Sequence, residues 1–447
     1  MNGCRLHRRL AGLCARAALL RRHGTVPHSN AHIARVGRHW YVMGAAAVVL
    51  ALGTSLATSA ASSASSAPPV VSAATPGGQA AHIEAIVRQA MRADHLNAVI
   101  FRVTVDGQPV VTGASGMSMT GVPATTAMHF RNGAVAISYM STLLMEFVDE
   151  HKVSLSDKVS RWLPALPDAN LVTLKMLANM TSGYPDYVTN PTLSAELYAD
   201  PFRAFTVPQL LAIAFSRPMS FAPGTNWGYA HTNYVILGEI LQKVGDKPLA
   251  TLLRQKVLDP LGLTNTVASQ TAAIPSPVLH AFSSERRQFL GIPPTTPFYE
   301  ESTFWNPSWT LAAGAVETTN IYDMTATAEG IGSGVLLSKS SYQAQTGPNL
   351  LGFGHAQSGC SCMKQTTLYN YGLGIVRSGS WLLQNPLFAG YAATEAYLPA
   401  EKIAIAVAVT FAPGAFDAQG NYANSSTSIF QEIGAYMAPS NPPPTKE

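Results

Sequence analysis

Residues 130–138 read Phe-Arg-Asn-Gly-Ala-Val-Ala-Ile-Ser. They open an apolar run that extends from Ala134 to about His151, in which acidic residues appear only toward the far end. A run of this length and composition predicts a long apolar helix in the interior of the protein. The short polar segment in front of it, Arg131-Asn132-Gly133, marks the start of that helix.

The segments around this helix predict a mixed α+β fold. Residues 79–94 carry apolar side chains at helical spacing and predict an amphipathic helix. Residues 97–116 predict a β-hairpin, because apolar residues alternate along the first strand and Asp106-Gly107 supplies the turn. Near the C-terminus, residues 403–410 predict a buried strand and residues 425–437 predict a final helix.

The net charge of +4 comes from the first forty residues. Eight of the 29 lysines and arginines are arginines that precede Trp40, where there is no acidic residue; this leaves 21 basic against 25 acidic residues in the rest of the chain. The body therefore carries a charge of about −4. Such a body does not suggest a nucleic-acid-binding protein, which needs a basic face.

The N-terminal region has the order of an export signal. The arginine-rich start is followed by the uncharged residues 40–57 and then by small residues at 60–67. We expect residues 1–67 to be an export signal, or an anchor if residues 40–57 remain in the membrane, with the body outside the cytoplasm in either case. Residues 68–78 are rich in Pro, Ala, Ser and Gly and predict a linker.

Several later motifs follow in a fixed order. Residues 172–187 predict a helix that ends in Thr181-Ser182-Gly183, and residues 223–238 read Pro-Gly-Thr-Asn-Trp-Gly-Tyr-Ala-His-Thr-Asn-Tyr-Val-Ile-Leu-Gly. A glycine turn follows at 312–319, and two strand-like segments lie at 371–375 and 390–399. Together with the helix after Gly133, this order resembles that of the penicillin-recognising serine hydrolases, which include class C β-lactamases, D-Ala-D-Ala carboxypeptidases and related esterases.

The resemblance implies an α/β sandwich. Its antiparallel sheet would be flanked by the N- and C-terminal helices, and an all-helical insertion would occupy roughly residues 140–310. The whole β-lactamase-like domain would span residues 79–440. No cofactor and no metal site is expected.

The resemblance also locates three catalytic motifs, and all three are altered. The family's Ser-x-x-Lys, a nucleophile and its proton acceptor, falls on Ala134 and Ile137. The second motif keeps Tyr229 but has His231 in place of an asparagine. The third motif, counted back from Tyr397-Leu398-Pro399, falls on Gln384, Asn385 and Pro386, which lack the cation and the glycine. Pro386 also removes a backbone N–H from that strand.

Two other features of the sequence carry less weight. Ser361-Cys362-Met363-Lys364 spells Ser-x-x-Lys but lies in a Gly- and Cys-containing loop, without the apolar helix that the motif requires. Cys360 and Cys362 are one residue apart, so either free thiols or a labile bridge would be compatible with the spacing. We interpret this segment as an ordinary loop.

Three functions remain open at this point. The first is an exported protein without acyl-serine catalysis that binds cell-wall peptide, a small carboxylate or a protein partner through Tyr229, His231, Gln384 and Asn385. The second is an esterase or peptidase in which Ser138 or Ser182 is the nucleophile and His231 the base. The third is a structural envelope protein without a ligand.

Overall fold

The computed structural model describes residues 76–269 and 271–445. The expected export signal and residues 68–75 of the expected linker lie outside the described residues. The first helix, α1 (Pro76–Ala93), begins three residues before the predicted start, inside the expected linker. Within the described residues, no helix combines the length and the apolar character that crossing a membrane requires.

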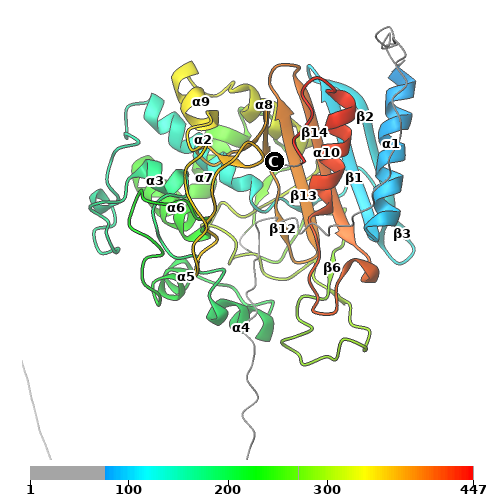
Figure 1. Ribbon diagram of the computed structural model, residues 1–447, viewed down its shortest axis with the longest axis horizontal. Coiled ribbons are helices and arrows are strands. Elements are labelled where there is room, and N and C mark those ends of the chain that lie inside the picture. The colour runs from blue at the N-terminus through cyan, green and yellow to red at the C-terminus, as the bar shows by residue number, and fades with distance from the viewer. Residues whose placement is uncertain (1–75, 270, 446–447) are drawn as a thin grey trace, which may run out of the picture. The chain divides into compact units, whose positions relative to one another are not determined.

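The core of the fold is a nine-stranded antiparallel sheet (Figure 1), in which β12 pairs with β13 beside the main order β3-β2-β1-β14-β13-β11-β10-β9. The strands are β1 (Leu96–Val105), β2 (Gln108–Met119), β3 (Val122–Pro123), β9 (Asn370–Tyr371), β10 (Val376–Ser378), β11 (Trp381–Gln384), β12 (Leu387–Phe388), β13 (Tyr391–Leu398) and β14 (Ile403–Phe411). The predicted hairpin is β1–β2, and both turn residues, Asp106 and Gly107, have positive φ, as a two-residue hairpin turn requires.

Side-chain alternation along β1 divides the core between the two faces of the sheet. Val99, Phe101 and Val103 belong to the cluster that includes residues of α1 and of α10 (Ser425–Met437), whereas Ala98 and Ile100 belong to the cluster that includes α8 (Ile321–Ser333). Helices α1 and α10 therefore cover one face of the sheet and α8 packs on the other (Figure 1). The predicted bounds of α10 are confirmed, and so is the α+β fold class.

The central helix α2 (Val135–Asp149) begins one residue after the predicted start and has twelve buried residues among its fifteen. Because it is apolar on every side, it lies inside the molecule between α6 (His231–Gly245), α7 (Leu249–Leu253) and α9 (Lys339–Thr346). Two acidic residues at its far end share a cation, since Lys256 forms ion pairs with both Glu146 and Glu150.

The predicted insertion is helical in its first part. It holds α3 (Leu174–Ala178), α4 (Pro191–Ala199), α5 (Val207–Ala214), α6, α7 and the short helices η1 (Val159–Arg161) and η2 (Arg254–Leu258). After Leu258 it consists mainly of loops, with β5 (Val267–Ala268), β6 (Phe282–Ser283) and β7 (Glu300–Glu301). This second part departs from the all-helical expectation because β5 joins β4 (Phe130–Arg131) and β8 (Glu317–Thr319) in a small sheet beside the start of α2.

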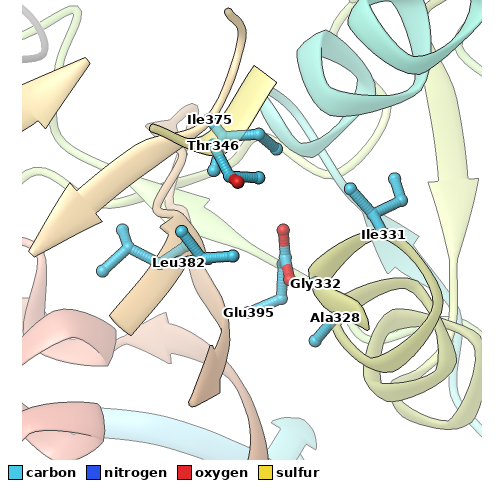
Figure 2. Close-up of a pocket in the computed structure, with 8 residues that line it drawn as sticks. Ala328, Ile331, Gly332, Thr346, Ile375, Leu382 and Glu395 are labelled. Atoms are coloured by element: carbon cyan, nitrogen blue, oxygen red, sulfur yellow. The ribbon is translucent and has the colours of Figure 1, made fainter. Parts of the chain in front are cut away.

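A buried carboxyl group lies between the large sheet and α8. Glu395 of β13 is 4% exposed and points into a cavity of about 10 Å³, which has room for about one water molecule (Figure 2). Most of the lining is apolar, including Ala328, Ile331 and Leu382. Burial raises the pKa of Glu395 well above its ordinary value and so favours the neutral form of this side chain.

Candidate functional site

The fold brings the first and third motifs together at the start of α2. Gly133 has a φ of +50°, and a Cβ atom at this position would lie 2.6 Å from the ring of Phe388 and 2.6 Å from Cβ of Pro386. The segment after β11 is therefore packed directly on the residue that precedes Ala134. Two segments about 250 residues apart in sequence meet where the resemblance predicts a catalytic centre.

At the first motif the two side chains have different surroundings. Ala134 is partly exposed, whereas Ile137 is completely buried in the largest apolar cluster. A methyl group at 134 cannot act as a nucleophile, and an aliphatic side chain at 137 needs no charge partner in the core. The two residues of the first motif therefore contribute to packing, and neither offers a group for acyl transfer.

The start of α2 still presents a free backbone donor at Ala134. The N–H groups of Val135, Ala136 and Ile137 donate to carbonyls three residues earlier, at 3.0–3.2 Å. Among the described residues, the N–H of Ala134 has no acceptor, and Ala134 provides no side-chain cap. The resemblance to the family places this N–H where the nucleophile contributes an oxyanion donor.

Neither proposed replacement nucleophile faces this region with a free hydroxyl. Ser138 is fully buried, and its hydroxyl donates to the carbonyl of Val135 at 2.7 Å. Ser182 is also fully buried; it donates to Oδ1 of Asn233 at 2.5 Å and accepts from the N–H of Tyr184 at 3.0 Å. The structure brings neither serine into hydrogen-bonding contact with His231.

The second motif places Tyr229 and His231 side by side. Their rings are 5.1 Å apart in an edge-to-face arrangement, and Tyr229 also packs edge-to-face on Tyr371 at 6.3 Å. Burial raises the pKa of the Tyr229 phenol well above its ordinary value. Tyr229 is therefore a neutral phenol that can donate a hydrogen bond, and it is not a base at physiological pH.

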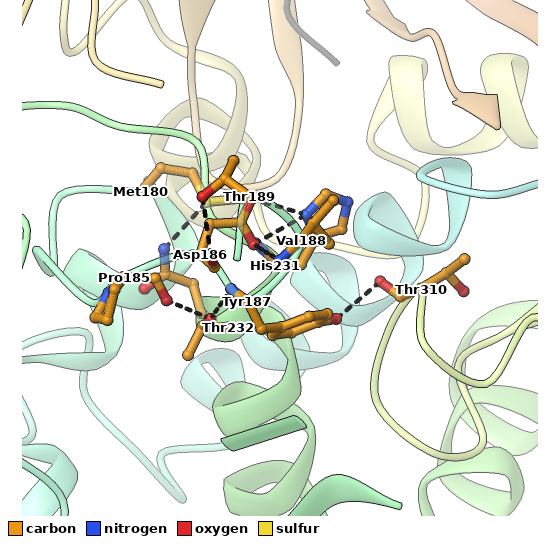
Figure 3. A network of polar contacts seen from close by, with 10 residues as sticks. Met180, Pro185, Asp186, Tyr187, Val188, Thr189, His231, Thr232 and Thr310 are labelled. Atoms are coloured by element: carbon orange, nitrogen blue, oxygen red, sulfur yellow. Dashed lines mark hydrogen bonds and ion pairs between the residues drawn. The ribbon is translucent and has the colours of Figure 1, made fainter. Parts of the chain in front are cut away.

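Sequence reasoning missed Asp186, which is the partner of His231 (Figure 3). Its carboxylate accepts from the backbone N–H of His231 at 3.1 Å and lies 3.2 Å from Nδ1 of the ring. It also accepts from the N–H of Val188 at 3.2 Å. With Nδ1 donating to Asp186, Nε2 of the neutral ring is left as an acceptor. A signal was available, because Asp186 follows closely on the Thr181-Ser182-Gly183 segment.

The loop that carries Asp186 is held on the start of α6 by a network of polar contacts (Figure 3). The hydroxyl of Thr232 donates to the carbonyl of Pro185 at 2.6 Å and accepts from the N–H of Tyr187 at 3.4 Å. The Tyr187 phenol in turn donates to the carbonyl of Thr310 at 3.2 Å. These bonds fix the carboxylate relative to the imidazole, so the pair is preorganised.

The third motif does not deliver both of its polar residues to this site. Gln384 is 2% exposed, and its amide donates to the carbonyl of Gly374 at 2.6 Å. Asn385 faces the other side of the sheet, where its amide donates to Thr427 of α10 at 3.3 Å. Both amides of the third motif are therefore hydrogen-bonded within the protein, that of Gln384 in the interior and that of Asn385 to α10.

The second motif is covered by a disulfide-bridged loop. Cys360 and Cys362 are bonded, which decides between the two thiol states that the sequence left open. The loop encloses, with Tyr184, Asp186 and Tyr229, a cavity of about 10 Å³ that admits about one water molecule.

Within the described part of the chain, no group of three or more His, Cys, Asp or Glu side chains could hold a metal ion.

A comparison with family models decides the family. The model described as "Beta-lactamase" matches residues 83–427, which is most of the chain. The chain belongs to the beta-lactamase family. The resemblance inferred from the motifs is therefore confirmed, and with it the membership of a serine-hydrolase family whose members include esterases and penicillin-binding proteins.

The chain is similar in sequence to an esterase and to a penicillin-binding protein. Esterase EstB of Burkholderia gladioli is 27% identical over 199 residues, 41% of this chain and 50% of the esterase. Penicillin-binding protein 4 of Amycolatopsis lactamdurans is 31% identical over 187 residues, 40% of this chain and 47% of that protein. The matched regions thus span about half of each relative's length.

Solved structures confirm the beta-lactamase-type fold over a longer stretch. A D-stereospecific amidohydrolase from Streptomyces superimposes with a TM-score of 0.65 at 20% identity, covering 78% of this chain and 98% of that one. A D-amino acid amidase from Ochrobactrum anthropi superimposes with a TM-score of 0.66 at 18% identity, covering 80% and 98%. At these identities the likeness concerns the fold alone.

Proposed function

We propose that this chain is a non-hydrolytic member of the beta-lactamase family that binds a cell-wall peptide through the peptide's terminal carboxylate. The observation that carries the proposal is the state of the first motif. Ala134 has no hydroxyl at the start of α2, and Ile137 is wholly buried where the family has a lysine. With neither a nucleophile nor a proton acceptor at that place, an acyl-enzyme cannot form there.

Three groups support binding without cleavage. The free N–H of Ala134 lies at the positive end of the α2 dipole, which favours an anionic or carbonyl oxygen. The neutral phenol of Tyr229 can donate a hydrogen bond, and Nε2 of His231, oriented by Asp186, can accept one from a peptide N–H. A carboxyl-terminal peptide offers matching groups to all three.

The names of relatives agree with this ligand class. They include penicillin-binding proteins and a putative D-alanyl-D-alanine carboxypeptidase of Escherichia coli that is 24% identical over 157 residues. A peptide that ends in a D-amino acid is therefore the first ligand to test. A protein partner is the second candidate, because the cavity beside Tyr229 admits only about one water molecule in the closed loop arrangement.

The proposal includes export, which the N-terminal sequence favours. The order of basic, apolar and small residues in 1–67 is that of an export signal or an anchor. Cell-wall peptide occurs outside the cytoplasm, so binding and location agree. An alkaline phosphatase fusion after residue 78 should be active in intact bacteria, and an inactive, cytoplasmic fusion would contradict this part of the proposal.

The main test is covalent labelling of the purified chain with a fluorescent penicillin and, separately, a fluorophosphonate. We expect no adduct by mass spectrometry, while calorimetry detects binding of an acylated D-Ala-D-Ala peptide. The His231→Ala variant should weaken this binding, whereas exposed Glu84→Gln on α1 should not change it. A stoichiometric serine adduct would contradict the non-hydrolytic function.

One observation favours a second candidate, a hydrolase with a different nucleophile. The Asp186–His231 pair has the arrangement in which an imidazole acts as a general base. Ser138 and Ser182 do not fit the nucleophile's role, since both are buried and already hydrogen-bonded. In this case the labelling experiment would place an adduct on another residue near His231 and would identify it.

A further inference from the structure

We propose that the Cys360–Cys362 disulfide is a thiol-exchange site, at which an external low-molecular-weight thiol opens the bridge and releases the loop that covers Tyr229, the neighbour of His231. The proposal does not depend on whether the covered site binds or hydrolyses its ligand. It concerns access to that site and rests on the position of the two sulfurs.

The bridge is at the tip of a closed loop. Backbone hydrogen bonds between Gly352 and Gln365 (2.8 Å) and between Gln365 and Phe353 (2.7 Å) close the loop at its base. At the tip, Cys362 forms a β-bridge with Gly228, and the N–H of Tyr229 donates to the carbonyl of Ser361 at 3.4 Å. The disulfide thus constrains the residues that touch the second motif.

The ring that this disulfide closes is too small to stabilise the whole domain. Its cysteines are two positions apart, and stabilisation by a disulfide grows with the number of residues that it encloses. The constraint therefore acts locally, on residues 360–362 and on their contacts with Gly228 and Tyr229. A bridge that controls access to the second motif would be expected to have such a local effect.

The two sulfurs differ in their accessibility. Cys360 is partly exposed, and its Sγ lies near the carbonyl of Gln357. Cys362 is 9% exposed, and its Sγ would lie 2.9 Å from a Cβ atom placed on Gly228. An external thiolate therefore reaches Cys360 and leaves Cys362 as the departing group.

The exchange balances with a thiol as the only co-reactant. The thiolate bonds to Sγ of Cys360, the Cys360–Cys362 bond breaks, and the Cys362 thiolate takes up a proton. A second thiolate then attacks the sulfur of the bound thiol and leaves the Cys360 thiolate, which is protonated in turn. In sum, two thiols become one external disulfide, and the protein disulfide becomes two cysteine thiols.

Other anchors keep the loop on the protein when the bridge is open. The side chain of Asn226 accepts from the N–H of His355 at 2.9 Å and donates to its carbonyl at 3.2 Å, and Gln357 donates to the carbonyl of Ser220 at 2.6 Å. None of these bonds involves a cysteine. Opening the bridge should therefore loosen the contacts of residues 360–362 and leave the rest of the fold in place.

The test compares the full-length oxidised chain with the same chain after millimolar reduced glutathione, and with the Cys360→Ser/Cys362→Ser variant. Hydrogen exchange of the Tyr229 amide and carbethoxylation of His231 report on access. We expect both to become faster by about fivefold or more in the reduced chain and in the variant, with thermal unfolding nearly unchanged. Alkylation and mass spectrometry separate Cys360 and Cys362 from Cys4 and Cys14.

Either of two results would overturn the proposal. One is a bridge that resists glutathione while the protein is folded. The other is a reduced chain in which the Tyr229 amide and the His231 ring react as slowly as in the oxidised chain. Because neither readout uses a ligand, failure here is separate from failure of the peptide-binding function. The glutathione-treated wild-type chain, which folded with its bridge intact, controls for folding defects in the double variant.

Discussion

The Asp186 carboxylate contacts His231 twice, through the backbone N–H at 3.1 Å and through Nδ1 of the ring at 3.2 Å. The first contact satisfies an N–H at the start of α6, whose preceding residue, Ala230, provides no side-chain cap. The second fixes the orientation of the imidazole. The same carboxylate thus stabilises the start of α6 and orients the imidazole of the candidate site.

Replacing Asp186 should therefore affect both the stability of the protein and the orientation of His231. Asp186→Ala removes the acceptor of two backbone N–H groups, those of Val188 and His231, and should lower the free energy of unfolding by about 1–3 kcal/mol. Asp186→Asn keeps an acceptor oxygen and should cost less. Urea denaturation measures both values. The exposed Asp200→Ala, which loses one turn contact, should change stability by only about 0.5 kcal/mol.

Gly133 should not tolerate a side chain. Gly133→Ala would place Cβ 2.6 Å from Phe388 and Pro386, at a positive φ, and should cost about 2–4 kcal/mol of unfolding free energy. Gly121→Ala is the matched control, because Gly121 also has a positive φ but has no atom within 4 Å of the added Cβ. Thermal unfolding should show a much larger loss of stability for Gly133→Ala than for Gly121→Ala. Adding Phe388→Ala to the Gly133→Ala variant should recover part of that loss. Equal losses at both glycines would contradict the packing of the third motif on the first.

Restoring the family's lysine alone should destabilise the domain. Ile137→Lys introduces an ammonium group into the apolar cluster around α2 and should cost about 3 kcal/mol or more at pH 7. Because burial disfavours the charged form, stability of this variant should rise with pH. Ile137→Met should cost less than about 1.5 kcal/mol. A stable lysine variant at neutral pH would show that the pocket around position 137 is hydrated.

Buried carboxyl groups predict that stability falls as pH rises. Burial raises the pKa of Glu395 well above its ordinary value and that of Glu317 to about 8. Below pH 4.5 both groups are protonated in the folded and unfolded chains. Above it the unfolded chain loses its protons first, so stability decreases until the pH exceeds the folded-state pKa.

Glu395→Gln tests this expectation, because it retains the shape of the side chain and cannot ionise. The stability of the variant relative to the wild type should increase as the pH rises above about 4.5, and this pH-dependent gain should be absent at lower pH. Exposed Glu84→Gln should show no such trend. Unfolding curves at several pH values measure the difference, and a constant difference across the range would contradict the assigned cause.

Much of the fold was predictable because local patterns decide it. The hairpin β1–β2 follows from alternation and from Asp106-Gly107, and α10 has the predicted bounds. The loops after Leu258 were not predictable in this way, since β5 pairs with β8, about 50 residues further on, and β8 pairs in turn with β4, about 190 residues before it. The altered catalytic motifs were also visible in sequence, but the geometry that replaces them was not.

By itself, the sequence determined the order of elements, the family and the absence of a hydroxyl at 134 and an amine at 137, because these depend on residue type and local periodicity. The tertiary structure alone decided that Asp186 orients His231, that Asn385 faces α10, that Ser138 and Ser182 are buried, and that the Cys360–Cys362 loop covers Tyr229. These relationships depend on contacts between distant segments and on the face to which each side chain points. The packing of the whole chain determines these long-range contacts and the direction of each side chain.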